Sequence, residues 1–121
     1  MSDETRTIKE AEDRVGEFCE QRNWDQFHNP KDLAIGIATE SSELLELFRF
    51  KTPEECRAML SDVKQKQKAC DELADVFYFV LRFAQMNGID LYDSLTEKIA
   101  KNNEKYPVSL SKGCNKKYDE L

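Results

Sequence analysis

Apolar residues recur along this chain at the three- and four-residue spacing of amphipathic helices, and no stretch alternates with the two-residue period of a strand. In the first periodic segment, for example, Ile8, Val15 and Phe18 share one helical face, with charged residues between them. Residues that commonly begin or end helices separate these segments. The pattern therefore predicts an all-α fold with helices over residues 7–21, 30–50, 53–60, 71–86 and 91–103.

Residues that cap helices mark several of these boundaries. Asn29 is a good N-cap in front of Pro30. Thr52 stands before another proline, with Glu55 placed for a capping box. Asp90 is the expected cap of the last helix. The chain thus specifies the starts of three helices by local chemistry.

Two segments outside these helices bear on the domain boundaries. The polar and basic segment 61–68 is either an exposed connection or the solvated first turns of the next helix. Pro107 stops the last helix, and residues 108–121 show no clear period. A chain of 121 residues has room for one domain of ordinary size. We therefore expect a helical domain over residues 1–107 and a C-terminal tail over 108–121.

The stretch from Asp71 to Met86 is apolar on nearly every side, and we expect the fold to be organised around it. Glu72 and Asp75 lie three residues apart, on the face that continues through Phe79. An unpaired carboxylate that faces a core either destabilises the fold or takes up a proton, so such a pair needs cationic partners or a metal ion. This pair is the first indication of a functional site.

A second pair of acids, Glu40 and Glu43, interrupts the apolar stripe of the helix over 30–50, and Glu46 lies further to the side. If the two helices pack antiparallel, four carboxylates converge, and divalent ions such as Mg²⁺ or Mn²⁺ would relieve their repulsion. The only histidine, His28, excludes the di-iron site that needs Glu-x-x-His. Acid pairs also arise by chance in an acidic chain, so solvated acids on a purely structural bundle are the alternative.

Composition narrows the class of protein. The net charge is −6, with 24 acidic and 18 basic residues, which disfavours nucleic-acid binding. Four cysteines without a C-x-x-C pair indicate reduced thiols and no zinc site, and we expect Cys19 and Cys70 in the core. No apolar run approaches the ~20 residues of a membrane span, and the polar N-terminus lacks an apolar signal region. We therefore expect a cytoplasmic protein without a membrane partner.

Two further segments carry candidate binding residues. Trp24 and His28 stand in a short polar segment, where aromatic residues either touch a ligand or close the end of a bundle. The last helix has a mostly basic flank, which suits a polyphosphate bound beside an acidic metal site. The residues of this flank are Lys98, Lys101, Asn102 and Lys105, with Tyr106 next to them.

With their neighbours, these residues resemble the MazG-like, all-α nucleoside triphosphate pyrophosphohydrolases. The segments from Glu40 to Glu46 and from Glu72 to Asp75 are similar to the E-x-x-E-x-x-E and E-x-x-D pattern of that family. Within the family the chain is most similar to the dCTP pyrophosphatase type, over nearly its whole length and in the same order. The further matching positions are Arg22–Pro30, Glu43–Phe48, Lys98, Asn102, Tyr106–Pro107 and Lys117–Tyr118.

The resemblance implies a four-helix bundle with a short extra helix between the two metal-ligating helices, assembled as an obligate homodimer or homotetramer. It implies Mg²⁺-dependent hydrolysis of a nucleoside triphosphate to the monophosphate and pyrophosphate. Glu43 is favoured to activate the attacking water, with Glu40 and Glu46 as the alternatives. The implied metal ligands are Glu40, Glu43, Glu72 and Asp75. The implied substrate-binding residues are Trp24, His28, Phe50, Phe79, Lys98, Asn102, Lys105 and Tyr106.

Three positions depart from the vertebrate form of this type, since Val15 replaces a histidine, Phe50 a tryptophan and Phe79 a tyrosine. The acids are unchanged, so we expect catalysis to survive. The pocket has lost polar groups, which leaves dCTP, a related pyrimidine deoxynucleotide or a modified nucleotide as the expected substrate. The alternative is a helical oligomer that binds nucleotides or a protein partner without turnover.

Overall fold

The computed structural model describes residues 1–121, and all its regular elements are helices. The α-helices are α1 (Ile8–Gln21), α2 (Pro30–Glu46), α3 (Pro53–Ser61), α4 (Val63–Met86), α5 (Leu91–Lys105) and α6 (Val108–Ser111). Short 3-10 helices are η1 (Ser2–Glu4), η2 (Asp25–Phe27) and η3 (Tyr118–Glu120). The chain divides into two compact units, Met1–Gly88 and Ile89–Leu121. The all-α class expected from the pattern is confirmed.

The α-helices α1 to α5 all begin at a capping side chain. The predicted capping box at α3 is complete, because the Thr52 hydroxyl accepts from the Glu55 amide at 3.2 Å and the Glu55 carboxylate accepts from the Thr52 amide at 3.0 Å. These contacts satisfy amide groups that the first helical turn leaves without partners. The other capping side chains are Thr7, Asn29, Asp62 and Asp90.

Helix α2 is shorter than the pattern predicts. It ends at Glu46 instead of Phe50. The Phe48 amide bonds to the Leu45 carbonyl at 2.9 Å, which is the three-residue spacing of a tight turn. The residues after Glu46 therefore continue as turns and do not add a further helical turn to α2.

Helix α4 is longer than the central stretch from which it was predicted. It begins at Val63, after Asp62 accepts a hydrogen bond from the Gln65 amide at 3.0 Å. The polar and basic segment 61–68 therefore includes the first turns of α4, which was one of its two interpretations.

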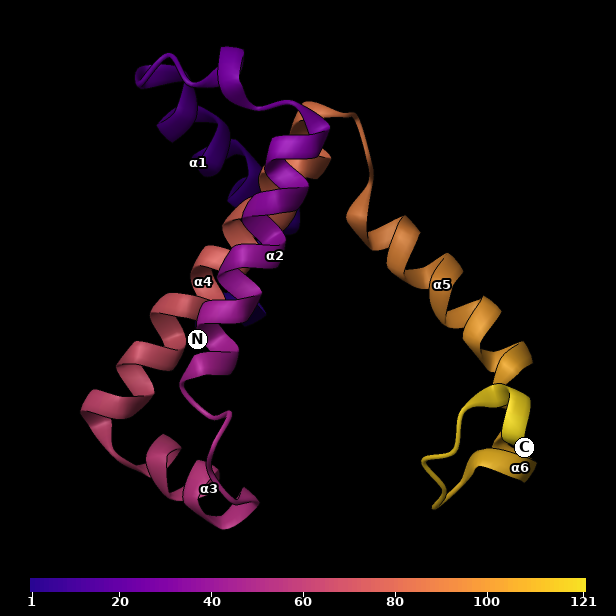
Figure 1. Ribbon diagram of the computed structural model, residues 1–121. Coiled ribbons are helices and arrows are strands. Elements are labelled where there is room, and N and C mark those ends of the chain that lie inside the picture. The colour runs from indigo at the N-terminus through magenta and orange to yellow at the C-terminus, as the bar shows by residue number, and fades with distance from the viewer. The chain divides into compact units, whose positions relative to one another are not determined.

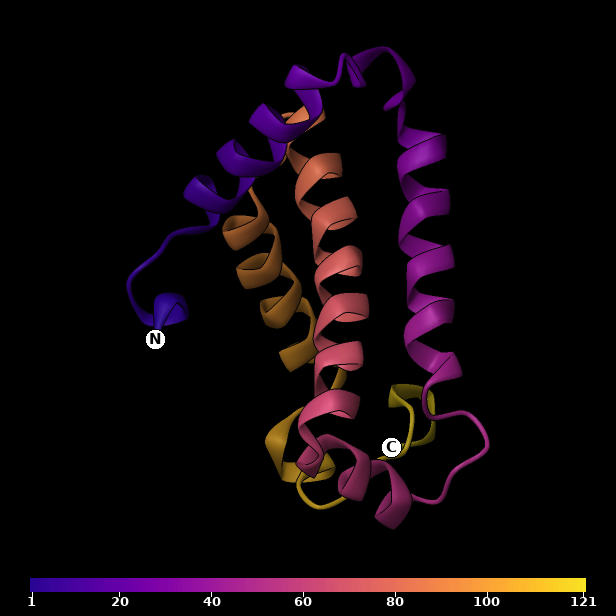
Figure 2. The same ribbon diagram turned by 90° about the vertical axis from the view of Figure 1, so that its left-hand side faces the viewer.

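Helix α4 is the central element of the unit Met1–Gly88. Figures 1 and 2 both show α2 beside α4 and running in the opposite direction. Helix α1 packs against the C-terminal half of α4, where the Cys19 sulfur contacts the Tyr78 hydroxyl at 3.1 Å, and α3 packs against α4 as well. The buried apolar residues that form the core of this unit are Cys19, Leu33, Leu81 and Ala84.

A glycine brings α2 and α4 together near the middle of their contact. A Cβ atom placed on Gly36 would lie only 2.5 Å from the ring of Phe79. No real Cβ tolerates so short a distance, so the absent side chain is what lets the ring lie against the backbone of α2.

The unit Ile89–Leu121 contains α5, α6 and η3. The ring of Tyr106 meets the ring of Tyr118 edge to face at 6.1 Å, and the Lys105 ammonium lies 4.8 Å from the centre of the Tyr118 ring. The segment 108–121, for which no period was evident, is partly helical, because it contains α6 and η3.

Two expectations about composition meet different outcomes. All four cysteines are free thiols, and Cys19 is buried as predicted. The prediction that Cys70 lies in the core is wrong, because Cys70 is exposed on α4. Side chains two residues apart point to different faces of a helix, so when Glu72 turns toward α2 the Cys70 side chain turns away.

None of the helices combines the length and the apolar character that crossing a bilayer requires.

Candidate active site

Three glutamates from the paired helices α2 and α4 meet in space. Glu40 and Glu43 come from α2 and Glu72 comes from α4, and one carboxylate oxygen of each lies within 4.8 Å of the others. The antiparallel packing of the two helices brings this about, which is the arrangement under which the sequence expected four carboxylates to converge. Glu40 and Glu72 are half-buried, and Glu43 is exposed.

The cluster contains carboxylate oxygens with no protein partner. The Oε2 atoms of Glu40 and Glu72 are buried and accept no hydrogen bond. None of the ion pairs in the structure involves the three glutamates. Buried polar atoms in folded proteins are normally satisfied, so two such oxygens in one cluster indicate that a ligand completes the site.

The electrostatics of the cluster agree with this interpretation. The pKa of Glu40 is raised above its usual value, first by burial and then by the neighbouring carboxyl of Glu43 and the charges of Asp75 and Glu72. The pKa of Glu72 is raised in the same way, by burial first and then by Glu43 and Asp75. Each of these two carboxyls is hard to ionise, first because it is buried and then because the other acids are close.

A divalent cation fits this donor set. The ligand atoms on offer are all carboxylate oxygens, which suit Mg²⁺ or Mn²⁺ and do not suit a soft metal. A bound cation would supply partners for the unpaired Oε2 atoms and would favour the charged form of each carboxyl. The residues present therefore fit the predicted metal.

Asp75 and Glu46 lie at the margins of this cluster. Asp75 is on α4 one turn after Glu72, is exposed, and lies close enough for its charge to raise the pKa of both Glu40 and Glu72. Glu46 is at the end of α2, where it forms an exposed ion pair with Arg49 at 2.6 Å. Asp75 thus lies near the cluster but outside the three glutamates whose oxygens meet, and Glu46 has another partner.

Four of the expected substrate-binding residues lie in the same unit as the acids. Trp24 and His28 flank η2, and their rings meet at 6.2 Å. Phe79 is half-buried against Gly36, on the side of α4 that faces α2. Phe50 lies beyond α2 and is 85% exposed, with the Arg49 guanidinium 4.4 Å from its ring centre.

The other four expected binding residues belong to the unit Ile89–Leu121. Lys98 and Asn102 are on α5, where Lys98 is exposed and Asn102 is half-buried. Lys105 and Tyr106 end that helix and both contact Tyr118. These positions share one helix, as the basic flank predicted.

One buried residue of the first unit was missed by the sequence analysis. The side chain of Arg82 is fully buried on α4 and bonds to His28, Asp25 and Gln85. A signal was present, because Arg82 is the only charged residue between Asp75 and Asp90. A cation within so apolar a stretch must find partners elsewhere in the fold.

Comparison with known proteins agrees with the geometry. Residues 35–121 match the MazG-like family. The chain is 32% identical to dCTP pyrophosphatase 1 of Mus musculus over 115 residues, which are 95% of this chain and 68% of that protein. It is 30% identical to dCTP pyrophosphatase 1 of Homo sapiens with the same coverage. The crystal structure of a pyrophosphatase from Archaeoglobus fulgidus superposes with a TM-score of 0.77 and 33% identity, covering 83% of this chain and 92% of that one.

Proposed function

Because the chain belongs to the MazG-like family and is an enzyme of the nucleoside triphosphate pyrophosphohydrolase class, we propose that it hydrolyses dCTP or a related pyrimidine deoxynucleotide with Mg²⁺. The products are the monophosphate and pyrophosphate, and the role of the reaction is control of the nucleotide pool. The observation that carries the proposal is the cluster of Glu40, Glu43 and Glu72, with its two unpartnered buried oxygens.

The metal site of the proposal uses acids from both helices. Mg²⁺, or Mn²⁺ as a second suitable ion, would be held by Glu40, Glu43, Glu72 and Asp75. When bound, the ion neutralises phosphate charge and makes a bound water more acidic. The protein contributes a preorganised set of carboxylate oxygens, two of which have no hydrogen-bond partner.

A glutamate also has to take the proton of the attacking water. Glu43 suits this role because it is exposed and yet within the cluster, so water reaches it. Glu40 is more buried, and Glu46 is engaged with Arg49. We therefore assign the general base to Glu43, with Glu40 and Glu46 as the alternatives.

The remaining residues bind the two ends of the nucleotide. Lys98, Asn102 and Lys105 hold the phosphate tail, since their donors match phosphate oxygens. The pocket for the base and sugar is lined by Trp24, His28 and Phe50, partly from a neighbouring subunit, and Phe79 bears on the choice of base. Tyr106 is a further substrate-binding residue of this proposal. Aromatic side chains suit this task because they offer flat apolar faces to a base.

The choice of base follows from what the pocket offers. Val15, Phe50 and Phe79 are apolar, so few fixed polar groups are available to reject a modified ring. We therefore propose activity on pyrimidine deoxynucleotides with tolerance of substituents at carbon 5. The same proposal places the protein in the cytoplasm as a homodimer or homotetramer. The exposed apolar side chains Leu73 and Phe77 of α4 support the assembly.

The test is pyrophosphate release from a panel of nucleoside triphosphates, including 5-modified dCTPs, with and without Mg²⁺. We expect Mg²⁺-dependent conversion of pyrimidine deoxynucleotides to monophosphates, and loss of at least about 100-fold in the Asp75→Asn variant. Asp13→Asn, on the exposed face of α1, is the matched control and should retain activity. Nucleotide binding without turnover on any member of the panel would instead support a non-catalytic binding protein.

A further inference from the structure

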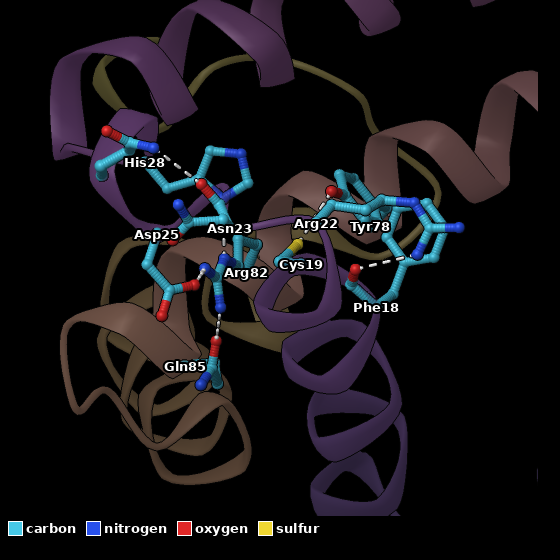
Figure 3. Close-up of polar contacts among 10 residues, drawn as sticks. Phe18, Cys19, Arg22, Asn23, Asp25, His28, Tyr78, Arg82 and Gln85 are labelled. Atoms are coloured by element: carbon cyan, nitrogen blue, oxygen red, sulfur yellow. Dashed lines mark hydrogen bonds and ion pairs between the residues drawn. The ribbon is translucent and has the colours of Figure 1, made fainter.

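The side chain of Arg82 is the largest fully buried group in the protein. Its Nε donates to Nδ1 of His28 at 2.8 Å, and its two terminal nitrogens donate to Asp25 and Gln85. Figure 3 shows the guanidinium among these partners, with two of them contributed by the chain around η2. A buried guanidinium keeps its charge, so this set of bonds satisfies a cation inside the fold.

These bonds join parts of the chain that are far apart in sequence. Within residues 24–28 the backbone bonds are local, such as the Phe27 amide to the Trp24 carbonyl at 2.9 Å. The Trp24 amide also bonds to the carbonyl of Cys19 at the end of α1, at 3.0 Å. Only Arg82 links residues 24–28 to α4 by side-chain hydrogen bonds. Arg82 thus holds the segment that contains the only tryptophan and the only histidine of the chain.

The contact with Arg82 also decides which nitrogen of His28 carries the proton. The Nε of arginine is only a donor, so Nδ1 of His28 must accept and cannot itself be protonated. A neutral imidazole in this position carries its proton on Nε2. The pKa of His28 is lowered by burial and then by the charge of Arg82, which keeps the ring neutral near pH 7.

We propose that Arg82 is a positioning residue that holds residues 24–28 against α4 and keeps His28 as a hydrogen-bond donor at Nε2. The partner of that donor is an acceptor oxygen on the nucleoside part of the substrate, such as a ring carbonyl. This inference rests on the proposed function for the identity of the ligand. The state of His28 in the free protein follows from the geometry alone.

The first experiment reads the protonation of His28 directly. Because the chain has a single histidine, a long-range proton–nitrogen NMR spectrum contains one imidazole. We expect a protonated Nε2 and an unprotonated Nδ1 in the native protein, and a mixture of tautomers in Arg82→Met. A proton on Nδ1 of the native protein would overturn the proposal, as would an unchanged spectrum in Arg82→Met.

Ligands added to the same sample identify what the donor binds. Addition of dCMP should shift the Nε2 resonance, whereas inorganic tripolyphosphate should leave it in place. A shift with tripolyphosphate alone would overturn the assignment of the partner to the nucleoside. These spectra need no turnover, so their result is independent of whether the proposed hydrolysis is observed.

Kinetics and fluorescence test the positioning role. In Arg82→Met we expect KM to rise about tenfold with kcat changed by less than about threefold, because the segment binds the nucleotide and does not react. Quenching of the single tryptophan by acrylamide should be stronger in Arg82→Met than in the native protein. Arg57→Met, at an exposed position on α3, is the matched control and should change neither quantity.

Arg82→Lys supports the test in case the methionine variant folds poorly. It keeps the charge but loses the planar fork that reaches three partners at once. We expect an intermediate rise in KM and partial loss of the single tautomer. Native kinetics and a native imidazole spectrum in both variants would show that Arg82 serves only the stability of the fold.

Discussion

At the scale of single residues, the clearest feature is the pair of buried oxygens on Glu40 and Glu72 that accept no hydrogen bond. Each belongs to a carboxyl whose pKa is raised by burial and by the neighbouring acids. Without a cation, the folded state therefore holds repelling charges that the unfolded chain separates. Binding of a divalent ion should turn this repulsion into attraction.

Glu72→Gln is expected to remove this coupling between metal and stability. In the native protein, Mg²⁺ at about 100 times its Kd should raise the free energy of unfolding by about 2.7 kcal/mol. In Glu72→Gln that gain should largely vanish, while the metal-free protein should be no less stable than the native one. Thermal unfolding with and without MgCl₂ measures both effects.

Glu54→Gln on α3 is the matched control, because Glu54 is exposed and lies outside the cluster. It should keep the full response to Mg²⁺. An equal response to Mg²⁺ in Glu72→Gln would mean that Glu72 does not bind the ion.

His28 gives the molecule a pH dependence that can be predicted in sign. Its pKa in the folded state lies below the usual value of 6.5, through burial first and Arg82 second. The unfolded chain therefore binds more protons than the folded one between the two values. The stability contributed by neutral His28 should be complete above about pH 6.5 and should be lost as the pH falls through the folded pKa.

The measurement is denaturant unfolding of the native protein and of His28→Gln across this pH range. Glutamine does not titrate, so the difference between the two proteins isolates the imidazole. The native protein should lose stability relative to His28→Gln as the pH falls below 6.5. A difference that is constant with pH would refute the lowered pKa.

At the scale of elements, the pairing of α2 with α4 forms the site, and it was predictable. The acids on each helix stand on an apolar stripe, and two such stripes bury each other most fully when the helices lie side by side. The depth of the contact was not predictable in detail, because the ring of Phe79 sits where Gly36 has no side chain. That contact depends on the relative height of the two helices, which periodicity does not encode.

Gly36→Ala should destabilise the protein by about 1 to 3 kcal/mol, because the new methyl group meets the Phe79 ring at 2.5 Å. The better helix propensity of alanine offsets up to about 1 kcal/mol of this. Urea unfolding measures the net effect, and Phe79→Leu in the Gly36→Ala background should recover part of the loss.

Gly16→Ala is the comparison within the same unit. A Cβ at Gly16 would lie 3.1 Å from the end of the Gln85 side chain, which is able to move away. We expect a change within about 1 kcal/mol of zero. Equal effects at the two glycines would show that helix propensity, and not the contact with Phe79, governs both.

Helix starts could be predicted from local sequence, whereas one helix end and one buried side chain could not. The starts of α2, α3 and α5 followed from their caps, since a capping side chain acts within four residues. The end of α2 at Glu46 had no such signal, because no glycine or proline follows directly. Arg82 was missed for a similar reason, since its partners at residues 25 and 28 are distant in sequence.

At the scale of the whole molecule, the question is what covers the central helix, because within the unit Met1–Gly88 large apolar side chains of α4 are exposed. Leu73 and Phe77 stand four residues apart on one face of α4 and are 58% and 49% exposed. Neighbouring exposed apolar groups of this size indicate a contact surface. The family resemblance implies an oligomer, and the apolar character of the stretch from Asp71 to Met86 on nearly every side agrees with it.

We therefore expect the native protein to sediment as a dimer or tetramer of its 14.1 kDa chain. Phe77→Glu, with a charge placed on this face, should shift the mass toward the monomer at micromolar concentration. Analytical ultracentrifugation measures both species. A monomeric native protein would contradict the proposed assembly, and an unchanged mass in Phe77→Glu would place the contact elsewhere.

The capping side chains at the starts of α1 to α5 have a consequence for how the protein folds. Each helix start is specified by residues no more than four positions apart, so nascent helices form on the microsecond timescale without help from distant parts of the chain. Packing of α2 against α4 then closes the connection 47–62 between them. Because α3 forms within that connection, less flexible chain remains to be ordered. In the proposed oligomer the encounter between chains is the one step whose rate depends on protein concentration.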